Sequence, residues 1–176
     1  MIGPRAWAPL VVAVALAWSA SADIKVTPLV TDGHVSASID APDAFTEDSR
    51  EVIKSGVPLT LTYRVELRRP AMLFDSTVGS ATVAARVKFD SLTGAYLVTK
   101  EQDGRVTSAQ NTPKEEEMRA WITRFDGVAV QASEALVPNT EYYLHVRLQI
   151  RPNPKFSLLP WGRDDGLGRA DFTFIR

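Results

Sequence analysis

Apolar and polar residues alternate along much of this chain, most clearly in two segments. Within Leu59–Arg68 and again within Glu141–Arg151, alternate positions carry Leu, Val, Ile or Tyr, and the positions between them are mostly polar or charged. A period of two places successive side chains on opposite faces of a strand. Both segments are therefore predicted to be strands with one face on a core and the other in solvent.

Turn-forming residues divide the rest of the chain into further short extended segments. Asp32-Gly33 and Asp103-Gly104 tolerate the positive φ angles of tight hairpin turns, and Asp126-Gly127 and Pro138-Asn139-Thr140 also precede extended segments. The further predicted strands are Ile24–Thr31, His34–Asp40, Thr77–Asp90, Ala95–Glu101, Arg105–Ala109, Val128–Gln131 and Ala170–Ile175.

Two short helices are predicted between these strands. The first follows a cap at Thr46 or Asp43 and stops at Ser55-Gly56. The second spans Pro113–Arg124, with Thr112 to Glu115 as a capping box that places proline at the first helical position. Many short antiparallel strands with one or two inserted helices predict a mainly β protein, an immunoglobulin-like antiparallel β-sandwich.

The N-terminus has the features of a secretory signal peptide. Arg5 precedes an apolar run from Trp7 to Trp18, and Ala20-Ser21-Ala22 supplies small residues at a cleavage site. A membrane-spanning helix needs about 20 apolar residues, so a retained signal anchor is the less favoured alternative. We expect residues 1–22 to be removed and residues 23–176 to form a single exported domain, with no membrane span after cleavage.

Composition excludes several classes of function. The chain has 20 basic and 21 acidic side chains, a balance that argues against nucleic-acid binding. It has no cysteine and only two histidines, too few for a zinc site built from these residues. It also lacks the G-x-S-x-G nucleophile motif. We therefore assign no catalytic, metal-binding or cofactor-binding residue, and expect no cofactor.

Two loops carry the mixture of arginine and large apolar residues that is typical of protein interfaces. The first contains Arg68, Arg69 and Phe74 at the end of a predicted strand, and the second contains Trp161 and Arg163 in a proline-rich segment. These five residues are the candidate interaction residues. The simpler alternative is that each loop folds its apolar residues back onto the sandwich.

Several short motifs, in this order and spacing, resemble those of the bacterial domain of unknown function 4390 family. They are Ser55–Leu61, Glu66–Pro70 with Asp75, Leu92–Val98 and Tyr142–Leu148. The resemblance implies a proteobacterial protein exported to the periplasm and often encoded near a membrane histidine kinase of the nitrogen-regulation type. It implies no reaction and no catalytic residues.

Three hypotheses follow from the sequence. The preferred one is a non-enzymatic periplasmic module that binds an envelope protein such as a membrane histidine kinase. The second is a carrier or sensor of a small apolar ligand or lipid, suggested by the abundance of inward-facing Leu, Val and Tyr. The third is a hydrolase, which would require a convergent polar pocket near Tyr143, His145 or the acidic loop at Asp164-Asp165.

Overall fold

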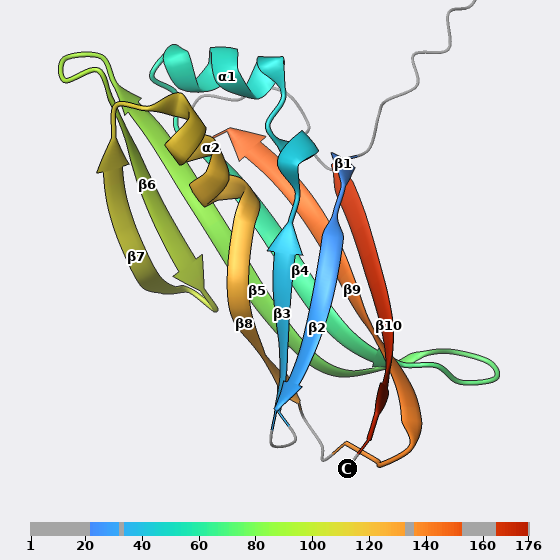
Figure 1. Ribbon diagram of the computed structural model, residues 1–176. Coiled ribbons are helices and arrows are strands. Elements are labelled where there is room, and N and C mark those ends of the chain that lie inside the picture. The colour runs from blue at the N-terminus through green and yellow to red at the C-terminus, as the bar shows by residue number, and fades with distance from the viewer. Residues whose placement is uncertain (1–21, 32–33, 133–135, 153–164, 176) are drawn as a thin grey trace, which may run out of the picture.

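The computed structural model describes residues 22–31, 34–132, 136–152 and 165–175. In this part of the chain two β-sheets lie face to face, and two short helices cover one end of them (Figure 1). The predicted mainly β sandwich is therefore confirmed. The described residues leave out residues 1–21 of the predicted signal peptide, the Asp32-Gly33 turn and the loop with Trp161.

The larger sheet contains the two segments with the clearest alternation. Its strands, in spatial order, are β1 (Ala22–Asp23), β10 (Gly166–Phe174), β9 (Thr140–Pro152), β4 (Leu59–Arg69), β5 (Ser76–Asp90), β6 (Ala95–Gln102) and β7 (Arg105–Thr112). Apart from the parallel pair β1 and β10, neighbouring strands in this sheet are antiparallel.

The smaller sheet covers one face of the larger one. It contains β2 (Lys25–Thr31), β3 (His34–Asp40) and β8 (Arg124–Ala132). The long strand β5 joins the two sheets, because Gly79 and Ser80 pair with the end of β8 whereas residues 83–90 pair with β6.

The core lies between the two sheets and follows the predicted alternation. The larger sheet contributes Leu59, Leu61, Tyr63, Val65, Leu67, Val83, Ala85, Val87, Leu144, Val146 and Leu148. The smaller sheet contributes Val35, Ala37, Ile39, Phe125, Val128 and Val130. The opposite face of the larger sheet carries the polar partners, so burial of one face leaves the other available for binding.

The first helix follows its sequence signals closely. After a 3-10 turn at Pro42–Ala44, α1 (Glu47–Lys54) begins where the Thr46 side chain accepts a hydrogen bond from the Ser49 amide. Gly56, with φ of +83°, follows the C-cap. Of the two predicted caps, Thr46 is the correct one.

The second helix, α2 (Glu115–Thr123), begins two residues later than the capping box predicts. Thr112 does not cap α2, because it still pairs with Tyr96 as the last residue of β7. Its hydroxyl instead accepts from the Lys114 amide and donates to Glu117 at 2.7 Å. The continuing strand ladder thus displaces the helix start, and the predicted capping box is wrong.

A second correction concerns Asp126-Gly127, which was predicted to separate two elements. Both residues lie inside β8, where the register with β3 shifts between Ala37 and Ile39. Gly127 has φ of +63°, the left-handed conformation of a β-bulge. The dipeptide therefore bends one strand rather than ending it.

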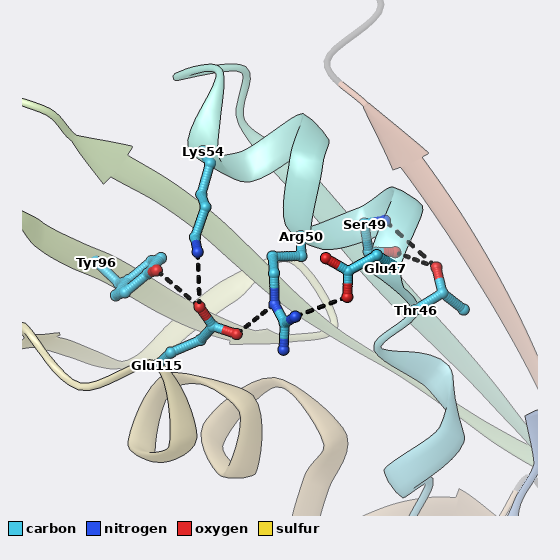
Figure 2. A network of polar contacts seen from close by, with 7 residues as sticks. All are labelled: Thr46, Glu47, Ser49, Arg50, Lys54, Tyr96 and Glu115. Atoms are coloured by element: carbon cyan, nitrogen blue, oxygen red, sulfur yellow. Dashed lines mark hydrogen bonds and ion pairs between the residues drawn. The ribbon is translucent and has the colours of Figure 1, made fainter.

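Glu115 connects the two helices (Figure 2). Its carboxylate accepts from Arg50 Nε at 2.5 Å and from the Tyr96 hydroxyl at 3.3 Å, and Lys54 Nζ lies 3.3 Å away. Arg50 also pairs with Glu47 at 2.6 Å. Burial raises the pKa of Glu115, but the hydrogen bonds from Arg50 and Lys54 outweigh it and lower the pKa. We interpret this network as structural, because each charged group in it has a partner.

Candidate binding surface

The loop between β4 and β5 exposes three consecutive large apolar side chains. Met72, Leu73 and Phe74 have exposed fractions of 102%, 84% and 87%. The loop projects from the end of the sandwich opposite to α1 and α2 (Figure 1). The alternative that it folds back onto the sandwich is wrong for this loop. Contiguous exposed apolar side chains on a globular domain commonly mark an interaction site.

Asp75 fixes the base of this apolar loop, which we define as residues 70–75. Its Oδ1 accepts from the Ala71 amide at 3.2 Å and its Oδ2 accepts from the Tyr143 hydroxyl of β9 at 2.5 Å. The hydrogen bond from Tyr143 lowers the pKa of Asp75 most, and that from the Ala71 amide lowers it further. The carboxylate closes the loop and ties it to the sheet, so the apolar tip is held away from the core.

Tyr143 lies between two arginines on the outer face of the larger sheet. The guanidinium carbon of Arg169 on β10 is 3.9 Å from the centre of the Tyr143 ring, and that of Arg68 on β4 is 5.9 Å away. Both contacts are of the cation–π type. Arg169 also forms two-pronged hydrogen bonds with Asp171, of which the shortest is 2.7 Å.

His145 lies next to this group, two residues along β9. Its Nδ1 is buried, has no hydrogen-bond partner among the described residues and is 3.9 Å from a Glu66 carboxylate oxygen. Glu66 is itself paired with Arg147 at 3.2 Å. Burial, and then the positive charge of Arg147, lower the pKa of His145, whereas Glu66 opposes this effect. This lowered pKa favours the neutral form of the His145 imidazole.

A concave pocket of about 410 Å³ opens between these side chains. Its lining residues are Arg68, Tyr143, His145, Leu167, Gly168 and Arg169. The convergent polar pocket that the hydrolase hypothesis requires is thus present around Tyr143 and His145. However, the lining residues that the structure describes include no serine, threonine or cysteine nucleophile and no carboxylate.

The structure brings some of the sequence-predicted residues together. Arg68 lies at the base of the apolar loop, where it donates to the Asp75 carbonyl, and Phe74 belongs to the exposed tip of the same loop. Arg69 is the last residue of β4. Trp161 and Arg163 lie outside the described residues.

Tyr143 and His145 were named for the pocket that a hydrolase would require, whereas the contribution of Arg169 to this pocket was missed. The first two were predicted on the polar face of a strand, which indicated a shared surface. Arg169 could not be placed, because it precedes the predicted terminal strand Ala170–Ile175 and the real β10 begins at Gly166.

Among the described residues, no group of three or more His, Cys, Asp or Glu side chains could hold a metal ion. The helices in that part of the chain include none long and apolar enough to cross a membrane.

Comparison with known families identifies the chain. The model of a family described as "Domain of unknown function (DUF4390)" matches residues 20–153, which include the apolar loop, Tyr143 and His145. The chain belongs to the DUF4390 family. The suspected resemblance is confirmed, and Arg169 lies beyond the matched segment. Neither the curated proteins nor the solved structures include a significant match to this DUF4390 protein.

Proposed function

We propose that this DUF4390 protein is an exported, non-enzymatic module of the periplasm that binds another protein through its apolar loop. The observation that carries the proposal is the near-complete exposure of Met72, Leu73 and Phe74. Fully burying side chains of this size contributes about 1.5–3 kcal/mol each. A partner that covers the loop therefore gains a hydrophobic anchor that the monomer leaves in water.

The surroundings of the loop support a protein partner. Arg68 and Arg69 end β4 directly before the loop, and arginine beside apolar anchors is enriched at protein interfaces. The anchoring of Asp75 to Ala71 and Tyr143 presents the tip in one position, which reduces the entropy lost on binding. The family resemblance suggests an envelope protein, such as the extracytoplasmic part of a membrane histidine kinase, as this partner.

Site-specific photo-crosslinking tests this proposal in cells that export the full chain. A photoreactive phenylalanine analogue replaces Leu73 in one strain and Leu92 in a control strain. Leu92 is 95% exposed but lies in the β5–β6 turn, at the opposite end of the sandwich. We expect a discrete crosslinked product from position 73 only, with an envelope protein identified by mass spectrometry. Equal products from both positions, or none from position 73, would contradict the proposal.

The apolar-ligand hypothesis depended on inward-facing Leu, Val and Tyr side chains. In the described residues these side chains pack against one another, with Tyr63, Leu61 and Leu144 among those fully buried. Native mass spectrometry of the protein purified without detergent provides the test. A copurifying lipid would favour this alternative over the protein-binding module.

A further inference from the structure

We propose that the pocket beside Tyr143 binds an oxyanion, either a carboxylate or a phosphate group, between Arg68 and Arg169. This site adjoins the base of the apolar loop and shares Arg68 with it, but the proposal does not rest on the identity of a protein partner. Arginine suits such a group because its planar guanidinium donates two parallel hydrogen bonds to carboxylate or phosphate oxygens.

The two arginines approach the pocket from opposite sides of β9. Arg68 comes from β4 and Arg169 from β10, and both guanidinium groups lie near the ring of Tyr143. Packing against the ring holds each charge in place, so little side-chain entropy remains to be lost when a ligand binds.

Both arginines retain donors for a ligand. Arg169 uses Nε and Nη2 on Asp171, and among the described residues its Nη1 makes no hydrogen bond. Arg68 donates from Nη2 to the Asp75 carbonyl over 3.4 Å, a weak bond. Its Nε is buried and has no hydrogen-bond partner among the described residues, so the terminal nitrogens of Arg68 are the donors for a ligand.

The carboxylates near the pocket are already engaged. Glu66 accepts from Arg147, Asp75 accepts from Tyr143, and Asp171 accepts from Arg169. Among the described part of the lining there is no carboxylate. The lining therefore presents two positive charges and a neutral histidine. The nearby carboxylates reduce the positive electrostatic potential of the pocket, so we expect selective but weak binding of a single small anion.

The shape of the pocket extends the ligand class beyond an inorganic ion. A volume of about 410 Å³ falls within the range of about 300–1,000 Å³ typical of small-molecule sites. Leu167 and the Tyr143 ring supply apolar walls next to the arginines. A small organic acid, a phosphate ester or an acidic side chain of a docked protein would fit both features.

His145 provides a direct spectroscopic probe of the site. It lines the pocket, and the only other histidine, His34, lies on β3 of the smaller sheet and serves as an internal control. The charged and titratable groups that face His145 are Tyr143 and Arg147 on β9, Arg64, Glu66 and Arg68 on β4, Arg169 and Asp171 on β10, and Asp75 in the loop. A bound anion would oppose the arginines among them and make protonation of His145 easier.

The experiment is an NMR pH titration of both histidines in the mature protein, at constant ionic strength with chloride as the reference anion. Inorganic phosphate and acetate are added in separate arms, which distinguishes phosphate from carboxylate recognition. We expect at least one of them to raise the midpoint of His145 while that of His34 stays unchanged. Equal shifts of both histidines, or no shift with either anion, would overturn the proposal.

Variants on the same face identify the arginines responsible. Arg68→Gln and Arg169→Gln should each weaken the anion response of His145 by about tenfold. Arg86→Gln is the matched control, because Arg86 lies on β5 next to Glu101 and away from the pocket lining. The spectrum of each variant without anion reports whether it folds. A folded Arg169→Gln protein that keeps the full response would exclude the assigned site.

Discussion

The hydroxyl of Tyr143 donates a hydrogen bond of 2.5 Å to Oδ2 of Asp75, which lies 68 positions earlier in the chain. This contact joins the base of the apolar loop to the outer face of the larger sheet. It also orients the ring against which Arg68 and Arg169 pack. One tyrosine thus connects the proposed protein-binding loop with the proposed anion pocket.

Removal of this hydroxyl should loosen the loop without unfolding the sandwich. In Tyr143→Phe, Asp75 keeps only the Ala71 amide as a donor. We expect faster amide hydrogen exchange in residues 71–75 and unchanged protection in β4. The pKa of Asp75 should also rise towards its ordinary value, because its largest stabilising hydrogen bond is lost. Identical exchange in the variant and the wild type would show that Tyr143 does not hold the loop.

The apolar tip should contribute nothing to folding. Leu73→Ser and Phe74→Ser remove side chains that are almost fully exposed, so each should change the free energy of unfolding by less than about 0.5 kcal/mol. Leu67→Ala, six residues before Leu73 but fully buried, should cost about 2–5 kcal/mol. Urea unfolding followed by circular dichroism measures all three. A large loss in either serine variant would mean that the loop packs on the domain.

Periodicity and turn residues were sufficient to predict most of the fold. Both alternating segments are strands with the expected buried face, and Thr46 caps α1 as predicted. The errors at Thr112 and Asp126-Gly127 have a common cause. A local motif cannot reveal that a cross-strand partner, Tyr96 for Thr112 or β3 for Gly127, extends the strand through it.

The candidate surface was only partly predictable for a similar reason. The mixture of Arg68, Arg69 and Phe74 is local, so composition alone could indicate it. The pocket instead requires the register of three strands, which places Arg169 opposite His145 and His145 opposite Glu66. That register depends on tertiary packing, and the sequence pattern carried no signal for it.

Close packing of the two sheets makes Gly168 sensitive to substitution. A Cβ atom there would lie 2.6 Å from the Ile24 carbonyl oxygen and 2.8 Å from Cγ2 of Val26. Relief of these clashes requires the backbone to move, so Gly168→Ala should destabilise the protein by about 1–3 kcal/mol. Gly104→Ala is the control, because Gly104 has φ of +77° but nothing within 4 Å of the Cβ position.

Both glycine variants are compared by urea denaturation. The free energy of unfolding of the control, Gly104→Ala, should decrease by about 1 kcal/mol through backbone strain alone. The two variants should also differ in which segments show faster amide hydrogen exchange. Gly168→Ala should increase hydrogen exchange in β10 and β2, whereas Gly104→Ala should affect only the β6–β7 turn. Equal stability of Gly168→Ala and the wild type would mean that the sheets separate easily at this point.

The depressed pKa of His145 should make stability depend on pH in mildly acidic solution. Burial and then Arg147 lower this pKa below the ordinary value of 6.5, which the unfolded chain retains. As the pH falls below about 6.5, the unfolded state therefore binds a proton that the folded state still excludes. Stability should decrease as the pH falls from about 6.5 to the pKa of His145 in the folded state. Below that pKa, the titration of His145 should no longer affect stability.

The measurement compares urea midpoints of the wild type and His145→Gln between pH 7 and pH 5 in chloride buffer. Glutamine keeps a polar side chain but cannot titrate. The stability of the variant should therefore decrease much less than that of the wild type as the pH falls. The carboxylates with lowered pKa, Asp75 and Glu115, titrate below this window and affect both proteins equally. Phosphate should reduce the dependence of the urea midpoint on pH in the wild type alone, because a bound anion raises the pKa of His145 in the folded state. Parallel curves for the two proteins would show that burial and the nearby arginines do not keep His145 neutral.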